Sequence, residues 1–170
     1  FLASGGEQVG GWRFVTRLGQ YGHDFVARAA TACFGYGANE PAEASYPFTV
    51  LDSTGQPMDG TRRYRIRFAP GQLPPVDAFW SITMYTRPDN QLVANPIQRY
   101  NISSETPGLL YGADGSLDVA VQHAAPESAG ERANWLPAPA GAFWLILRMY
   151  EPRAEVLALR YTPPAVERIA

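Results

Sequence analysis

The segment that most constrains this chain is a run in which basic and large apolar side chains alternate. Residues 63–68 read Arg-Tyr-Arg-Ile-Arg-Phe. A period of two is typical of a β-strand with one buried face and one solvated face. Residues 79–85 and 117–122 alternate in the same way, and clusters of Gly, Pro, Asp and Asn lie between such segments. The pattern therefore predicts short antiparallel strands stacked in layers.

About seven or eight such strands with a single helix predict an all-β fold, an antiparallel jelly-roll-like β-sandwich. The expected hairpins pair residues 46–51 with 63–68, 79–85 with 91–94, and 109–111 with 117–121. Residues 143–150 are apolar on both faces, which predicts a central strand covered from two sides. Residues 155–161 are expected to form a further strand. We expect the sandwich to span residues 45–170, after an N-terminal linker and helix at residues 1–44.

One helix is expected in that N-terminal part. Apolar side chains recur every three or four positions between residues 20 and 36, and two glycines then supply a stop signal. A second apolar stripe through Val26, Ala30 and Phe34 widens the apolar face. The helix is therefore expected to lie between two surfaces, docked on the sandwich or on an upstream domain.

Charge and composition argue against two classes of partner. All 14 basic residues are Arg, they are spread along the chain, and the formal net charge is −2. A nucleic-acid site needs a basic patch that neutralises successive phosphates, so no nucleic acid is expected. No apolar run approaches the roughly 20 residues of a membrane-spanning helix, so no membrane partner is expected.

The single cysteine, Cys33, can form no disulfide within the chain. Because it falls on the apolar stripe of the expected helix, we expect it to pack in the core. The chain begins at Phe1 and not at Met, which is expected of a trimmed chain, a processed product or a fragment whose upstream part is missing.

No motif for a metal, a cofactor or a nucleophile stands out. The two histidines, His23 and His123, are too far apart in the sequence for a His-x-His or His-x-x-x-His metal pair. Neither Ser81 nor Ser116 lies in a Gly-x-Ser-x-Gly segment. We therefore predict no metal site and no cofactor, with the histidines at the surface or in a capping role. Whether the chain is an enzyme is left open.

A candidate site comes from the long loop at residues 127–139, which carries Trp135 where an irregular segment needs an anchor. In one interpretation the loop is a structural plug. In the other, one end of the sandwich forms a ligand pocket with fixed cations and an aromatic wall. The residues predicted to meet there are Asn95, Arg99, Tyr100, Asn134, Trp135 and Arg148.

Arg148 is the strongest reason for the pocket interpretation. It shares a strand face with bulky apolar side chains, so its guanidinium needs a carboxylate, carbonyl groups or an anionic ligand. Asp114 or Asp118 is the favoured partner, since buried charges are normally paired within the fold. If neither lies within reach, the ligand interpretation gains.

Several spaced segments together are similar to a known bacterial family. They are Phe79-Trp80-Ser81, Asn95-Pro96-Ile97-Gln98-Arg99-Tyr100, Asp114-Gly115-Ser116-Leu117, Asn134-Trp135-Leu136-Pro137-Ala138-Pro139 and Leu147-Arg148-Met149-Tyr150. Over about residues 45–165 the chain resembles the family called domain of unknown function 1214, and the shared order of the segments makes the match specific. The opening, with Tyr21-Gly22 and Tyr46-Pro47-Phe48, further resembles the linker after an upstream domain of unknown function 1254.

This resemblance implies a jelly-roll-like sandwich beside a second such domain, and an export signal that would place the protein in the periplasm or outside the cell. It implies no reaction. Our first hypothesis is a structural and interaction module that packs against the upstream domain or a second chain, with a homo-oligomer left open. The alternative is a binder of small molecules, anionic ones among them, or a hydrolytic enzyme with its pocket at the domain junction.

Overall fold

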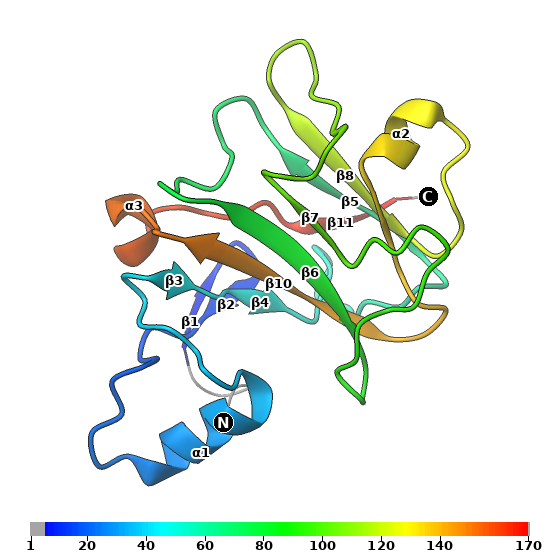
Figure 1. The fold of residues 1–170 in the computed structure, drawn as a ribbon. Helices are drawn as coiled ribbons and strands as arrows, with labels where there is room; N and C mark the ends of the chain where they lie inside the picture. The colour runs from blue at the N-terminus through cyan, green and yellow to red at the C-terminus, as the bar shows by residue number, and fades with distance from the viewer. Residues whose placement is uncertain (1–5, 170) are drawn as a thin grey trace.

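The computed structural model describes residues 6–169, without the side chain of Phe34. In this part of the chain two sheets form two layers (Figure 1). The elements are β1 (Glu7–Val9), β2 (Trp12–Phe14), α1 (Phe25–Phe34), β3 (Ala44–Ser45), β4 (Phe48–Thr49), β5 (Arg63–Phe68), β6 (Trp80–Thr86), β7 (Asn101–Ser103), β8 (Leu117–Gln122), α2 (Ala129–Ala133), β9 (Trp135–Pro137), β10 (Phe143–Tyr150), α3 (Ala154–Leu157) and β11 (Val166–Ile169). The predicted all-β sandwich class is confirmed, while a jelly-roll order of the strands stays a prediction.

The larger sheet has 7 strands in the order β1-β2-β4-β10-β6-β7, with β3 also paired to β10. The prediction that residues 143–150 form a central strand is confirmed, because β10 pairs with β6 on one side and with β3 and β4 on the other. The smaller sheet has the order β11-β5-β8-β9. Its pairs are antiparallel except for β8 and β9, which run parallel.

The core lies between the inner faces of the two sheets. On β5 the buried side chains are Tyr64, Ile66 and Phe68, while the arginines between them are exposed, as the alternation predicts. Phe143 of the larger sheet packs edge-on against Tyr64, with ring centroids 5.7 Å apart. Phe68 meets Trp80 of β6 at 5.3 Å. These contacts between aromatic rings join the two layers directly.

Two of the three predicted hairpins are wrong. Residues 46–51 do not pair with 63–68, because β4 joins β10 in the larger sheet while β5 joins β8 and β11 in the smaller one. Residues 109–111 form no strand beside β8, because the side-chain amide of Asn134 takes both the N–H and the carbonyl of Leu110. The third hairpin is confirmed only as a single bridge between Tyr85 and Leu92.

The predicted strand at residues 155–161 is also wrong. The chain forms the short helix α3 instead, and the last strand is β11. The run Ala154-Glu155-Val156-Leu157 contains three good helix formers, and Val156 is buried from this helix. The apolar residues of this segment fit the spacing of a strand, and they fit the spacing of one helical turn equally well.

The sandwich extends into the first 44 residues, where the sequence analysis had expected a linker and a helix. Strands β1 and β2 form a hairpin that joins the larger sheet through the pair Arg13 and Phe48. Trp12 and Phe14 are buried in the core, and the indole N–H of Trp12 donates to the carbonyl of Pro164 at 2.8 Å. The hairpin therefore belongs to the sandwich by both packing and hydrogen bonding.

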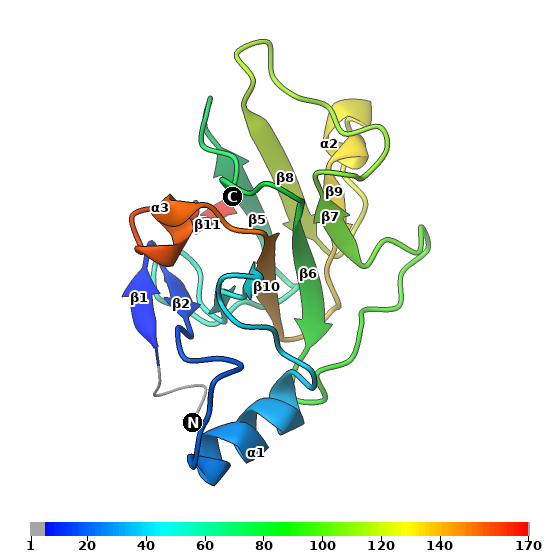
Figure 2. The same cartoon turned by 60° about the vertical axis from the view of Figure 1, so that its left-hand side comes forward.

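Helix α1 is shorter than predicted and lies apart from the two sheets in both views (Figure 2). It begins after Asp24, whose carboxylate accepts from the N–H of Ala27 at 2.9 Å, as an N-cap residue does. Ala27 is buried, yet Phe25 is 67% exposed and Val26 is 72% exposed. Cys33 is exposed too, so its expected place in the core is wrong. Within residues 6–169 no helix is long and apolar enough to span a bilayer.

The alternation along β10 predicts that truncating Leu147 and truncating Ile146 lower the free energy of unfolding by different amounts. Leu147 is 0% exposed in the core, so Leu147→Ala should lower the free energy of unfolding by about 2–5 kcal/mol. Ile146 projects from the other face and is half-buried, so Ile146→Ala should cost about half as much or less. Urea unfolding of the two variants measures both values. Equal losses would contradict the described sandwich.

Candidate functional site

Five of the six residues predicted to form a pocket lie near the loop that carries Trp135, and the side chains of four of them, Asn95, Arg99, Asn134 and Trp135, form hydrogen bonds that hold backbone groups in place. The guanidinium of Arg99 donates to the carbonyls of Ala133 and Trp135 at 2.8 and 2.9 Å. Trp135 is 4% exposed and its indole N–H donates to the carbonyl of Gln122. Arg99 thereby caps the last carbonyls of α2 with its charge, which suits the negative end of a helix.

Two asparagines tie down the neighbouring loops. The amide of Asn134 donates to the carbonyls of Leu110 and Asp118 and accepts from the N–H of Leu110. The amide of Asn95 accepts from the N–H of Arg99 and donates to the carbonyls of Val93 and Arg99. Apart from Asp118, which lies in β8, the backbone groups that these bonds satisfy belong to segments outside the named strands.

The arrangement fits the plug interpretation of the loop better than the pocket interpretation. Tyr100 follows Arg99 in the chain and is 36% exposed, so it is the member of the group that offers most surface to a ligand. A role of these residues in binding stays a prediction.

Arg148, the sixth residue, lies elsewhere, on the outer face of the larger sheet. Its Nη1 donates to the hydroxyl of Thr83 at 2.6 Å, and its Nη2 donates to the hydroxyl of Tyr85 at 2.9 Å. Its Cζ lies 5.8 Å from the centre of the Tyr85 ring, within cation–π range. Both partners project from β6, which is paired with β10.

The favoured acidic partners of Arg148 are therefore wrong. Asp118 pairs with Arg67 on the smaller sheet, and the carboxylate of Asp114 accepts from the N–H of Ser116 in a tight turn. In the described residues no ion pair includes Arg148. The strand β10 turns Arg148 toward the outside of the sandwich, whereas Asp118 projects from the other sheet.

Aromatic rings surround Arg148 on this outer face. Tyr85 stacks on Trp144 with ring centroids 5.0 Å apart, and Tyr150 stacks on a further ring, Phe79, at 4.4 Å. Tyr46 packs edge-on against Tyr150. We call the side chains of Tyr46, Thr83, Tyr85, Trp144, Arg148 and Tyr150 the Arg148 face.

Tyr46 links this face to the segment that follows α1. Its hydroxyl donates to the side-chain carbonyl of Asn39 at 2.6 Å. Burial raises the pKa of Tyr46, and Tyr150 adds to that rise, although Asn39 and Arg148 act in the opposite direction. The phenol therefore stays protonated, and available as a donor, well above neutral pH.

Sequence reasoning missed Thr83 and Tyr85 as partners of Arg148. The alternation on residues 79–85 did place both side chains on one face of the strand. The missing information was that β6 pairs with β10, so that Ser81 lies opposite Arg148 and Thr83 opposite Ile146. Given this register, the outward residues of the two strands would have pointed to the same site.

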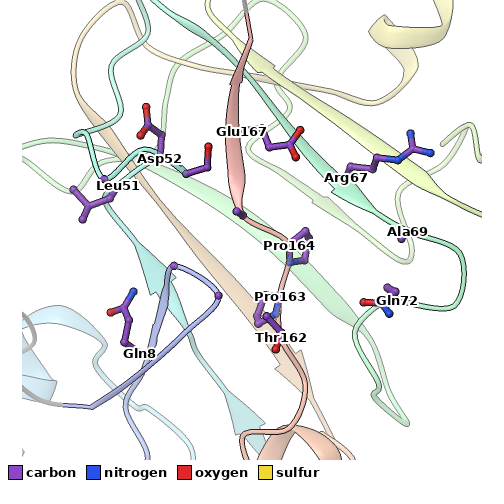
Figure 3. A pocket seen from close by; sticks show the side chains of 15 residues that line it. Gln8, Leu51, Asp52, Arg67, Ala69, Gln72, Thr162, Pro163, Pro164 and Glu167 are labelled. Atoms are coloured by element: carbon purple, nitrogen blue, oxygen red, sulfur yellow. The ribbon is translucent and has the colours of Figure 1, made fainter.

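A hollow with a volume of about 680 Å³ lies at the β11 side of the molecule (Figure 3). Its charged side chains are already engaged within the protein. Asp52 accepts from the N–H groups of Thr54 and Gln56, and Glu167 accepts from Arg65 at 2.7 Å. Since this hollow presents satisfied polar groups and no predicted site residue, the Arg148 face is the stronger candidate.

The histidines do not contribute to either place. His23 is exposed beside Phe25, and Nδ1 of His123 lies 2.9 Å from the carbonyl of Ala138, which agrees with the expected capping role of His123. Among residues 6–169 no cluster of three His, Cys, Asp or Glu side chains could hold a metal ion.

Fold and site together define a two-sheet β-sandwich domain whose larger sheet carries an outward aromatic face around one arginine. The family described as Protein of unknown function (DUF1214) matches residues 43–154. The chain therefore belongs to this family, as the spaced segments had predicted. A comparison with curated proteins gave no match.

A solved structure shares the fold. The VPA0106 protein of Vibrio parahaemolyticus is 26% identical, with a TM-score of 0.71 over 84% of this chain and 35% of its own. An uncharacterized protein from Burkholderia cenocepacia is 20% identical, with a TM-score of 0.46 over 78% of this chain and 31% of its own. This chain thus spans about a third of the length of the solved proteins it matches.

The bonds of Asn134 predict that it is a stability residue. Asn134→Ala would remove three part-buried hydrogen bonds to the backbone of Leu110 and Asp118, which should lower the free energy of unfolding by about 2–3 kcal/mol. Asn101→Ala, on an exposed strand position, is the matched control and should cost about 0.5 kcal/mol or less. Chemical unfolding measures both. A neutral Asn134→Ala would show that the loop is held by other contacts.

Proposed function

We propose that this chain is an interaction module of a longer protein, and that α1 packs against an upstream domain of that protein. The observation that carries the proposal is the exposed apolar side of α1. Phe25 and Val26 are 67% and 72% exposed, and Cys33 is exposed on the same side of the helix. Large apolar groups gathered on one exposed surface are typical of a contact with another protein surface.

Helical spacing supports a single continuous patch. Phe25, Ala29 and Cys33 follow one another at intervals of four, and Val26 lies beside them, so these side chains share one side of the helix. Ala27 and Thr31, which are buried, lie on the opposite side. The helix is thus held to its own chain by one side and presents the other outward.

The length of a solved relative favours the proposal that the rest of the same protein covers the exposed side of α1. The Vibrio protein, at 26% identity, matches this chain over only 35% of its own length, so most of its length lies outside the part that this chain matches. In our proposal the part that covers α1 is the upstream domain of unknown function 1254, because the start of this chain resembles the linker that follows such a domain. A second copy of the chain is a further proposed partner, and an exported location is proposed from the resemblance alone.

Thiol accessibility of Cys33 tests the interface in the full-length protein. If the upstream domain covers α1, iodoacetamide should alkylate Cys33 at least about tenfold more slowly in the native protein than in urea, as measured by peptide mass spectrometry. Introducing charge with Phe25→Glu should speed the native reaction. Arg28→Glu, on the polar edge of the same helix, is the control and should leave the rate unchanged.

Two outcomes of this experiment contradict the proposal. Alkylation of Cys33 at the urea rate in the native full-length protein would show that α1 is uncovered. Protection that disappears on dilution would assign the contact to a second copy, and light scattering of the same samples would report the dimer.

An anionic small molecule bound by this module is the second candidate function. The observation in its favour is that the structure gives Arg148 hydroxyl partners and no carboxylate. A hydrolytic role at the domain junction has no comparable support among the described side chains.

A further inference from the structure

We propose that the Arg148 face is a binding site for a small carboxylate with a flat apolar body. The inference goes beyond the interface of α1 and does not depend on it, because the Arg148 face is built from the larger sheet. Three properties of the face carry it: its charge, the orientation of the guanidinium, and the aromatic surface beside it.

The charged side chains that the strands of the larger sheet place on this outer face are arginines. The register puts Arg13 opposite Phe48 and Phe48 opposite Ile146, so Arg13 lies on the same face as Arg148. Among the described strand residues of the larger sheet whose side chains share this face, none is Asp or Glu. A half-buried guanidinium without a carboxylate is an attractive position for an anion.

The guanidinium is held in place before any ligand arrives. Thr83 and Tyr85 accept from its two terminal nitrogens, and these two bonds use two of the five N–H donors that an Arg carries. Thr83 projects from the middle of β6 and Tyr85 from near its end, and this strand is paired on both sides, with β10 and with β7. A fixed planar donor set of this kind suits the two oxygens of a carboxylate, and little entropy is lost when a ligand binds.

The rings beside Arg148 suit a flat apolar body. The stacked pair of Tyr85 and Trp144 is half-buried, so an aromatic or flat aliphatic group can pack on it and displace water from apolar surface. The hydroxyl of Tyr46 is already bonded to Asn39, which leaves the guanidinium as the main polar contact. One cation beside apolar surface matches one carboxylate better than a doubly charged phosphate, which needs several donors.

Titration of the full-length protein with sodium benzoate tests this site, with benzamide as the uncharged probe of the same shape. Isothermal titration calorimetry should detect benzoate binding that Arg148→Gln weakens about tenfold or more, since a charge-assisted pair is lost. Benzamide should bind at least about tenfold more weakly than benzoate. Arg168→Gln replaces an exposed strand arginine of the smaller sheet and should leave the affinity unchanged.

A gentler variant separates binding from folding. Tyr85→Phe keeps the ring and removes the hydroxyl that orients Arg148, so it should weaken benzoate about threefold while the thermal midpoint stays near that of the wild type. Far-ultraviolet circular dichroism checks that Arg148→Gln is folded.

Three results would overturn the inference. The first is no benzoate binding to a folded wild-type protein. The second is equal binding to Arg148→Gln. The third is tighter binding of inorganic phosphate than of benzoate, which would assign another anion to the face. Alkylation of Cys33 tests the α1 interface and not benzoate binding, so each of the two proposals can fail without the other.

Discussion

The packing of β10 against the smaller sheet is the contact on which the rest of the structure depends. Leu145, Leu147 and Met149 are fully buried from this strand, and strand geometry then forces the residues between them to the opposite side. The burial of Leu147 and Met149 thus fixes the outward direction of Arg148. Burial of every second residue of β10 therefore determines both the hydrophobic core on one side of the strand and the candidate site on the other.

Side-chain direction was the part of the fold that the sequence could predict. Alternation assigned the faces of β5, β6, β8 and β10 correctly, because burial of every second residue is a local property of a strand. The family and its sandwich followed from spaced segments. The central place of β10 followed from its apolar character on both faces, although one of those faces carries aromatic rings that are only half-buried.

Strand partners and the surroundings of the site could not be predicted, because both depend on contacts between distant segments. Residues 46–51 and 63–68 lie close in sequence yet belong to different sheets. Cys33 lies on the same side of α1 as other apolar residues, and within residues 6–169 this side of the helix is exposed. Arg148 was recognised as unusual, but its hydroxyl partners become visible only once β6 and β10 are aligned.

The two groups that orient Arg148 stand on the same strand as Ile82 and Met84, which are buried on its other side. The proposed binding site and the hydrophobic core therefore use separate sets of side chains, although they share one backbone. Replacements at Thr83 or Tyr85 alter the outer face and leave the buried side chains of β6 in place. The outer face of such a sheet can therefore vary in sequence while the packing between the two sheets is kept.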